Sequence, residues 1–262
     1  EERMHSEFLD RLLSGEINHD DSAYRQSMEK YGLLGKKAVA VIDYKFDEKY
    51  QQTENQAYHN DRVMRKMISL FERYFGKINY LNQYNRQAFI ISADNTEEKD
   101  IVNTIRTIYN IFIKENKHVH VRIGIGEIAQ GLEGLKKSYD QSRIARKTIN
   151  KSGVMFYKEL GIYQLLFYID DTSKIDDYVK EILNPLLIYD KKNNQNLIDT
   201  LREYLKCGQN VSQASQNLYI HRNTMIKRVE KIEELLGCSI KNAEVTNQLY
   251  NAVKIYDLFL KK

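Results

Sequence analysis

Short blocks of hydrophobic residues, separated by polar ones, divide the first 160 residues into predicted helices and strands. Five blocks rich in β-branched and aromatic residues predict strands: residues 38–44, 78–84, 87–92, 119–125 and 154–157. Hydrophobic residues three and four positions apart predict helices before and between the strands: residues 4–14, about 21–31, 55–74, about 96–112 and 132–149. The two strands on either side of a tight turn at Asn85 and Arg86 are expected to form a hairpin.

This order of elements predicts an α/β or α+β domain in which helices pack on one mixed sheet. Beyond Leu160 the strand pattern stops, and the remaining residues have only helical spacing. Pro185 and the polar residues 190–196 are the expected breaks in that helical part. We therefore expect four segments: N-terminal linker helices (1–36), a sheet domain (37–160), a helical connector (161–193) and an all-helical domain (194–262).

The all-helical segment has the spacing of short helices joined by a tight turn. Residues 197–205 form an amphipathic helix, and Ser212 is a suitable N-cap for a second helix at 213–218. After a turn at 219–220, a longer helix begins near Arg222. Its predicted buried side chains are Met225, Val229, Ile232 and Leu236. The outer face of its first turns is left with Arg222, Asn223, Thr224, Ile226, Lys227, Arg228 and Lys231.

This outer face suits a helix that enters the major groove of DNA. Lys and Arg neutralise phosphates, and Arg and Asn can form paired hydrogen bonds with guanine and adenine edges. The free N–H groups at a helix N-terminus can also bind a phosphate. From the residues alone, the alternative is a helical hairpin whose basic face is only solvated.

Composition and charge agree with a soluble nucleic-acid-binding protein but do not establish one. The chain has 40 Lys and Arg against 36 Asp and Glu, and residues 190–262 hold 12 against 8, so the excess lies in the last segment. No hydrophobic run is long enough to span a bilayer. Two cysteines outside any CxxC pattern argue against a disulfide framework, and we expect a cytoplasmic protein. The chain begins Glu-Glu-Arg-Met, which suggests that a further domain precedes it.

The stretch from Asn217 to Gly237 carries a specific motif. It reads NLYIHRNTMIKRVEKIEELLG, in which His-Arg-Asn-Thr opens the long helix, Arg228 follows, and Ile-Glu-x-Leu-x-Gly closes it. This pattern closely resembles the C-terminal helix-turn-helix of PucR/CdaR-type bacterial regulators, which are named for purine-catabolism and sugar-diacid regulation. The segment from Asn184 through 197–205 is similar to the part that precedes it in that family. Lys227 departs from the family, which often has an aromatic residue there.

A second resemblance extends over residues 37–157. Arg-Ile-Gly-Ile-Gly-Glu at 122–127 and the helix at 138–147 are similar to a strand and the following helix of diguanylate cyclases. Residues 37–157 thus resemble the degenerate GGDEF-like domain that precedes the helix-turn-helix in many PucR/CdaR-type regulators. In a cyclase the hairpin carries Gly-Gly-(Asp/Glu)-Glu-Phe, whose glycines admit the nucleotide and whose acid holds a metal ion. Here the hairpin reads Gln-Tyr-Asn-Arg-Gln-Ala at 83–88, with neither glycine nor acid.

The missing hairpin motif argues against catalysis. Asp43 in the first strand could mimic one metal-binding aspartate of a cyclase. Phosphoryl transfer needs a complete metal site and a phosphate clamp, and the remaining residues do not supply them. We therefore expect that the chain is not an enzyme and that it holds no cofactor or metal ion.

Three further patterns favour structural roles. His118 and His120 share a strand face but lack further metal ligands nearby. Gly124 and Gly126 form a lone GxG inside a strand, which indicates close packing rather than a dinucleotide site. Cys207 and Cys238 are expected to be buried small apolar residues.

Together these observations predict an effector-responsive transcription regulator of a metabolic operon that binds double-stranded promoter DNA as a homodimer. A small-molecule effector would act through a preceding N-terminal domain or through the GGDEF-like domain. The residues expected to contact base edges are Arg222, Asn223 and Lys227. Those expected on phosphates are Thr224, Arg228 and Lys231. His221 is expected to cap the long helix, and Ser212 and Gln213 complete the expected DNA-binding surface.

Two alternatives remain at this point. The chain could be a nucleotide-binding signalling domain that is related to diguanylate cyclases and lacks cyclase activity. It could also be a protein-interaction module whose helical tail recruits a partner, and its affinity for DNA would then be absent or indifferent to salt. The last helix, at 245–260, is expected to seal the helix-turn-helix core or to form dimer contacts.

Overall fold

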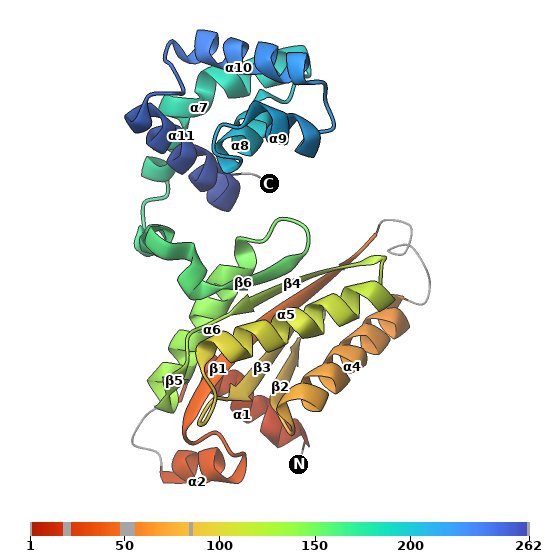
Figure 1. Cartoon of the computed structure of the whole chain (residues 1–262). Helices are drawn as coiled ribbons and strands as arrows, with labels where there is room; N and C mark the ends of the chain where they lie inside the picture. Colours follow the sequence, from red (N-terminus) through yellow and green to blue (C-terminus); the bar gives the residue numbers. More distant parts are fainter. Residues whose placement is uncertain (1, 18–21, 48–55, 84–85, 261–262) are drawn as a thin grey trace. The chain divides into compact units, whose positions relative to one another are not determined.

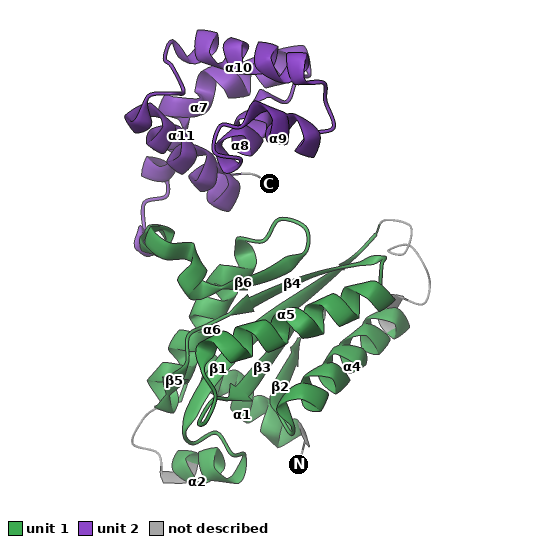
Figure 2. Cartoon of the chain, viewed as in Figure 1, with its two compact units in different colours: residues 1–167 green, residues 168–262 purple. Residues whose placement is uncertain are grey.

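A computed structural model describes residues 2–17, 22–47, 56–83 and 86–260 of the chain (Figure 1). It separates into two compact units, Glu1–Phe167 and Tyr168–Lys262 (Figure 2). Unit 1 contains all the described strands, and unit 2 is helical. Among the described helices, none has an apolar stretch long enough to cross a membrane.

Unit 1 is built on one mixed sheet, as the sequence predicts. Its strands are β1 (Lys36–Phe46), β2 (Asn79–Gln83), β3 (Arg86–Ser92), β4 (Val119–Ile125), β5 (Ala129–Gln130) and β6 (Gly153–Phe156). The main order is β2-β3-β1-β4-β6, and β5 pairs with the start of β1. β1 is antiparallel to β3 and β4, β2 and β3 form the expected antiparallel hairpin, and β6 is parallel to β4. Asn85 of the predicted hairpin turn lies outside the described residues.

Helices cover both faces of this sheet. They are α1 (Glu2–Ser14), α2 (Ser22–Lys30), α4 (Gln56–Phe75), α5 (Glu98–Glu115) and α6 (Gly131–Lys147), and a 3-10 segment, η1 (Tyr157–Tyr168), follows β6. α4 and α5 pack on one face in a core that includes Ile42, and α1 and α6 pack on the other in a core that includes Val41 (Figure 1). Successive side chains of a strand point to opposite faces. Both faces of β1 are buried, and its central residues 38–42 are therefore all hydrophobic.

The helix α1 belongs to unit 1 rather than to a linker. Its Leu9, Leu12 and Leu13 are buried in the second core, and His5 and Asp10 bond to residues of β2. The predicted division at residue 36 therefore differs from the structure. The periodicity of residues 4–14 identified the helix, but it gave no information on which surface would cover its hydrophobic side.

The glycines of the GxG pattern permit close packing of α6 on β4, as expected. A Cβ atom built on Gly124 would lie 2.0 Å from the backbone oxygen of Ser142, and one on Gly126 would lie 2.0 Å from the backbone oxygen of Ser138. Both oxygens belong to α6, so any larger residue would push this helix away from the strand.

Unit 2 contains α7 (Ser173–Asn193), α8 (Leu197–Lys206), α9 (Val211–Asn217), α10 (Arg222–Leu236) and α11 (Ala243–Ile255), followed by a π-helical turn, η2 (Tyr256–Leu260). The predicted break at Pro185 is wrong, because α7 continues through it. Pro185 and Glu181 are both exposed, so water can bind the carbonyl that the proline ring leaves without a donor. α7 contacts α10 and α11, and its Val179 and Leu183 are fully buried. The predicted connector is thus a structural helix of the same unit.

Candidate nucleic-acid interface

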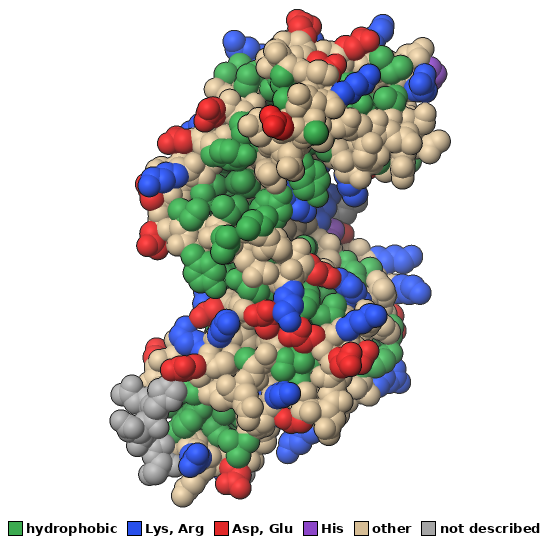
Figure 3. All heavy atoms as spheres, turned by 60° about the vertical axis from the view of Figure 1, so that its left-hand side comes forward, with side chains coloured by type: hydrophobic (Ala, Val, Ile, Leu, Met, Phe, Trp, Pro, Cys, Tyr) green, Lys and Arg blue, Asp and Glu red, His purple; other side chains and the backbone are tan. Residues whose placement is uncertain are grey.

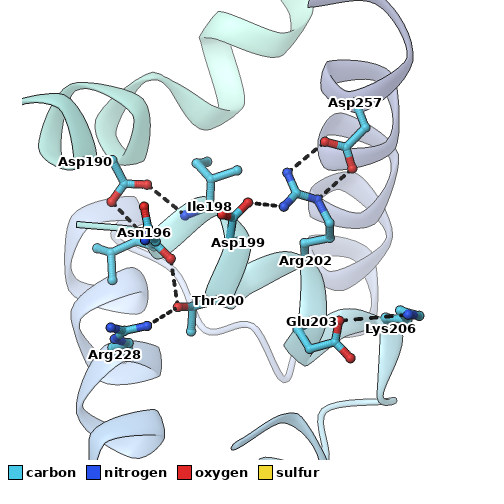
Figure 4. Close-up of polar contacts among 11 residues, drawn as sticks. Asp190, Asn196, Ile198, Asp199, Thr200, Arg202, Glu203, Lys206, Arg228 and Asp257 are labelled. Carbon is cyan, nitrogen blue, oxygen red and sulfur yellow. Dashed lines mark hydrogen bonds and ion pairs between the residues drawn. The ribbon is translucent and has the colours of Figure 1, made fainter. Parts of the chain in front are cut away.

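Polar contacts fix α8 at the centre of unit 2 (Figure 4). The carboxylate of Asp190, near the end of α7, accepts hydrogen bonds from the backbone N–H groups of Leu197 at 2.7 Å and Ile198 at 3.0 Å. Arg202 of α8 forms a two-pronged ion pair with Asp257 of η2, and both N–O distances are 2.7 Å. These contacts tie α7, α8 and the end of the chain into one scaffold for α9 and α10.

α9 packs against this scaffold and begins with a different cap from the one predicted. The side-chain oxygen of Asn210 accepts a hydrogen bond from the backbone N–H of Gln213 at 3.1 Å, so Asn210 is the N-cap. Ser212 lies inside the first turn and is exposed with Gln213, whereas Ala214 is fully buried. The signal was available in the sequence, because Asn210 and Gln213 have the spacing of a capping box.

α10 begins at the expected position and is capped as predicted. Nδ1 of His221 accepts a hydrogen bond from the backbone N–H of Asn223 at 3.2 Å. Met225 and Ile232 are fully buried, while the other two residues of the predicted buried stripe, Val229 and Leu236, are only half-buried. The buried residues fix the rotation of the helix about its axis, and therefore fix which side chains face outward.

The exposed side chains at the start of α10 are polar or basic, and none is acidic. Arg222, Asn223, Thr224 and Lys227 are all exposed. Asn223 and Lys227 are four residues apart, which places them one above the other on the side opposite Met225. The same side later carries Glu230 and Glu234, both exposed. Only the first two turns of α10 therefore present a surface that an anionic polymer would favour.

Arg228 and Lys231 point elsewhere than the sequence pattern suggested. Nη1 of Arg228 donates to the hydroxyl of Thr200 on α8 at 3.1 Å, and the residue is half-buried (Figure 4). Nζ of Lys231 lies 2.8 Å from Oε1 of Glu234 and 5.5 Å from the centre of the Tyr189 ring on α7. The hydrogen bond to Glu234 raises the pKa of the Lys231 ammonium. Both cations lie on a flank of α10 that already has partners within unit 2.

Net charge alone does not distinguish unit 2. Residues 168–189 add five acidic residues and two lysines, so the formal charge of residues 168–262 is only +1. On the face of unit 1 seen in Figure 3, basic and acidic side chains are interspersed. The electrostatic case for an interface therefore rests on the local set of side chains at the start of α10.

The candidate metal-binding aspartate of unit 1 has other partners. Oδ1 of Asp43 accepts from Nε of Arg122 at 2.9 Å, and Oδ2 accepts from Nη2 of Arg122 at 2.7 Å and from Nη1 of Arg146. Asp43 and Arg146 are buried, and burial lowers the pKa of the Arg146 guanidinium. Both oxygens of the Asp43 carboxylate are thus already paired with guanidinium groups.

The strand histidines and the two cysteines have surroundings that the structure describes. Among the described residues, no group of three or more His, Cys, Asp or Glu side chains is arranged to hold a metal ion. His120 instead places Nε2 at 3.0 Å from Oδ1 of Asp47. Cys207 and Cys238 are half-buried free thiols rather than fully buried ones, and burial raises the pKa of each.

Known protein families match both units. Residues 197–255 match the PucR C-terminal helix-turn-helix domain, and residues 15–148 match the GGDEF-like domain. The first match covers α8 to α11. The second begins well before the predicted boundary at residue 37 and includes α2, whose Met28 is buried in the second core of unit 1.

The relatives are transcription regulators. The DNA-binding transcriptional activator AdeR of Bacillus subtilis (strain 168) is 22% identical over 273 residues, which is 97% of this chain and 60% of AdeR. The proline-responsive transcriptional activator PutR of the same organism is 30% identical over 147 residues, or 54% of this chain and 34% of PutR. Its purine catabolism regulatory protein is 43% identical over 68 residues, or 26% of this chain and 13% of that protein. The chain thus spans less than two thirds of each of these relatives. It belongs to the PucR/CdaR family of DNA-binding transcription regulators, with a GGDEF-like domain followed by a PucR-type helix-turn-helix.

Proposed function

We propose that this regulator recognises its operator by placing the first two turns of α10 in the major groove. The observation that carries the proposal is the exposure of Arg222, Asn223, Thr224 and Lys227 at the start of a helix whose opposite side is fixed in the core by Met225 and Ile232. Helix-turn-helix proteins read base edges with the N-terminal residues of this helix. The acidic Glu230 and Glu234 further along the same side would then lie beyond the groove floor.

Within this surface we assign separate roles. Arg222, Asn223 and Lys227 contact base edges, since Arg and Asn can each form two hydrogen bonds with one base. Thr224 lies on the flank of the same turn and contacts a phosphate. Ser212 and Gln213 on α9 contact the sugar-phosphate backbone of the DNA. Arg228 and Lys231 lie further around the same flank, where a phosphate would compete with their present partners.

The present partners of these lysines predict how much each one contributes to DNA affinity. A phosphate contact by Lys231 would have to replace Glu234, which lies 2.8 Å from its ammonium group. We therefore expect Lys231→Ala to weaken DNA binding less than Lys227→Ala, whose side chain is exposed. Equal losses of affinity in the two variants would contradict this ranking.

The regulator acts, in our proposal, as a homodimer on an inverted repeat. Unit 2 exposes several large hydrophobic side chains, including Tyr178, Ile188 and Tyr250, which contact with a second copy would cover. A two-fold dimer would bind half-sites whose centres are about 34–36 Å apart, or a multiple of one helical turn. Selection of bound sites from a random DNA pool, with sedimentation of the protein alone, tests both statements. Selected sites without two-fold symmetry, from a protein that sediments as a monomer, would remove the dimer.

We further propose that binding responds to a small metabolite and controls a metabolic operon. The names of two relatives, which refer to a response to proline and to purine catabolism, support this class of function. The effector would act through unit 1 or through a domain that precedes it. Titration of the operator complex with metabolites of the neighbouring operon measures the response as a change in DNA affinity.

The direct test of the interface compares wild type with Arg222→Ala on the selected site and on a scrambled site. A base contact by Arg222 predicts that the variant loses about 1–3 kcal/mol on the selected site and less on the scrambled one. Lys254→Ala is the matched control, because Lys254 is an exposed cation on α11 and its removal changes net charge equally. Equal affinity and equal sequence preference in wild type and Arg222→Ala would remove the assigned role.

A further inference from the structure

Tyr219, in the turn between α9 and α10, has a backbone conformation that tyrosine rarely adopts. Its φ is +53°, in the left-handed region, at the position just after the last turn of α9. The backbone N–H of Ile220 donates to the carbonyl of Ser215 at 3.0 Å, a bond that closes a Schellman-type helix end. Glycine is the usual residue at this left-handed position, because any Cβ is unfavourable there.

Among the described residues, two other non-glycine residues have a positive φ, and each has a reason inside the chain. Asn194 is of the type that tolerates this region. Gln209 uses its side-chain amide to bond to the carbonyl of Ile240 at 3.2 Å and to the hydroxyl of Thr246 at 2.9 Å. Within the described part of the chain, the Tyr219 side chain makes no hydrogen bond, ion pair or ring contact. Its presence at a position that favours glycine therefore points to a partner outside the chain.

The ring of Tyr219 is held in solvent beside the recognition surface. It is 95% exposed, more than any other large hydrophobic side chain described, while its neighbours Leu218 and Ile220 are half-buried and anchor the turn. Two residues later comes His221, the cap of α10, followed by the exposed Arg222. Between Cys207 and His221 the sequence has no charged residue. The neighbouring residues along the chain are thus neutral or basic, which suits an anionic partner.

We propose that Tyr219 is a DNA-backbone contact that positions α10 in the groove. Its ring would pack against a deoxyribose and its hydroxyl would donate a hydrogen bond to a phosphate next to the bases contacted by Arg222. The assignment rests on the proposed function of α10. Phosphate and sugar contacts fix orientation without reading sequence, so the effect of Tyr219 is expected to be independent of base sequence.

The test uses the full chain and the variant Tyr219→Gly. Glycine relieves the left-handed conformation, so the melting temperature should be equal to or higher than that of wild type. The affinity for the selected operator should nevertheless fall by more than about tenfold, because the variant loses a hydrogen bond to a charged group and also the packing of the ring. Affinity for non-specific DNA should fall by a similar factor. Tyr219→Phe keeps the ring and removes the hydroxyl, and is expected to lie between wild type and Tyr219→Gly.

Further measurements distinguish a DNA contact from packing of the ring on a protein surface. Tyr74→Ala removes an exposed ring from α4 in unit 1 and should leave DNA affinity unchanged. A lower melting temperature for Tyr219→Gly would mean that the ring packs within the protein. A shift of its sedimentation equilibrium toward monomer would mean that the ring contacts a protein partner. Either result overturns the proposal, as does unchanged DNA affinity. If wild type itself fails to bind selected DNA, the proposed function of α10 fails, independently of Tyr219.

Discussion

Replacing Asp190 with Ala should loosen α8 while leaving unit 1 unchanged. α8 has no side-chain cap from its own N-cap residue, Asn196. The cap is supplied by Asp190, whose two carboxylate oxygens accept from the first N–H groups of α8 at 2.7 and 3.0 Å. A negative charge at this end also interacts favourably with the helix dipole.

The size of the effect follows from this geometry. Loss of a capping side chain costs about 0.5–2 kcal/mol. Here two hydrogen bonds and one charge are lost together, and Asp190 is half-buried, so we expect about 2 kcal/mol. At 1.4 kcal/mol per factor of ten, this corresponds to about 30-fold faster exchange of the amides of α8. Asp190→Asn keeps an acceptor but no charge and should show about half the change in free energy.

Hydrogen–deuterium exchange on the full chain is the assay, since it reports on α8 and on unit 1 separately. Asp176→Ala is the matched control: Asp176 also lies on α7, but its ion pair with Lys180 is exposed. Exposed pairs contribute little, so exchange in this control should change by less than about threefold. The reasoning is refuted if Asp190→Ala behaves like Asp176→Ala.

Three further predictions concern packing and pH. Asp43→Asn should destabilise unit 1 by about 3–5 kcal/mol in denaturant unfolding, because the buried Arg146 loses its counter-charge; a loss below about 1 kcal/mol would contradict this. Gly124→Ala should displace α6 and lower the melting temperature by several degrees, since its Cβ would lie 2.0 Å from a backbone oxygen; an unchanged melting curve would refute the close contact. The hydrogen bond from Asn217 lowers the pKa of Glu203, so the stability from this contact is present above the ordinary Glu pKa and lost as the pH falls through the lowered one. Acid titration of unfolding should show this loss in wild type, and a smaller one in Asn217→Ala.

The helices and strands were predicted well where the spacing of hydrophobic residues determines the type of element. The strands and helices of unit 1 follow from alternation and from helical spacing, and the start of α10 from the His-Arg-Asn-Thr motif. Sequence patterns could not show which surface each helix covers. The hydrophobic stripe of α1 gave no hint that it packs on the sheet, and Pro185 suggested a break that an exposed proline does not impose.

The candidate site was predictable in part, for a similar reason. Arg222, Asn223, Thr224 and Lys227 are exposed together because they precede or oppose the buried stripe. Arg228 looked equivalent in the sequence, but its guanidinium donates to Thr200 of α8, which is distant along the chain. Contacts with residues distant along the chain set the direction of such a side chain. The spacing of residues in the sequence does not reveal these contacts.

The continuity of α7 has a mechanical consequence for regulation. The helix runs unbroken for 21 residues, contacts α10 and α11, and carries near its end the residue that caps α8. A rotation of this rigid helix at Ser173 would therefore turn α10, the helix proposed to read DNA, together with its supports. In the proposed dimer, such a rotation would change the tilt of the two α10 helices, and hence the operator spacing that they match, without unfolding either helix.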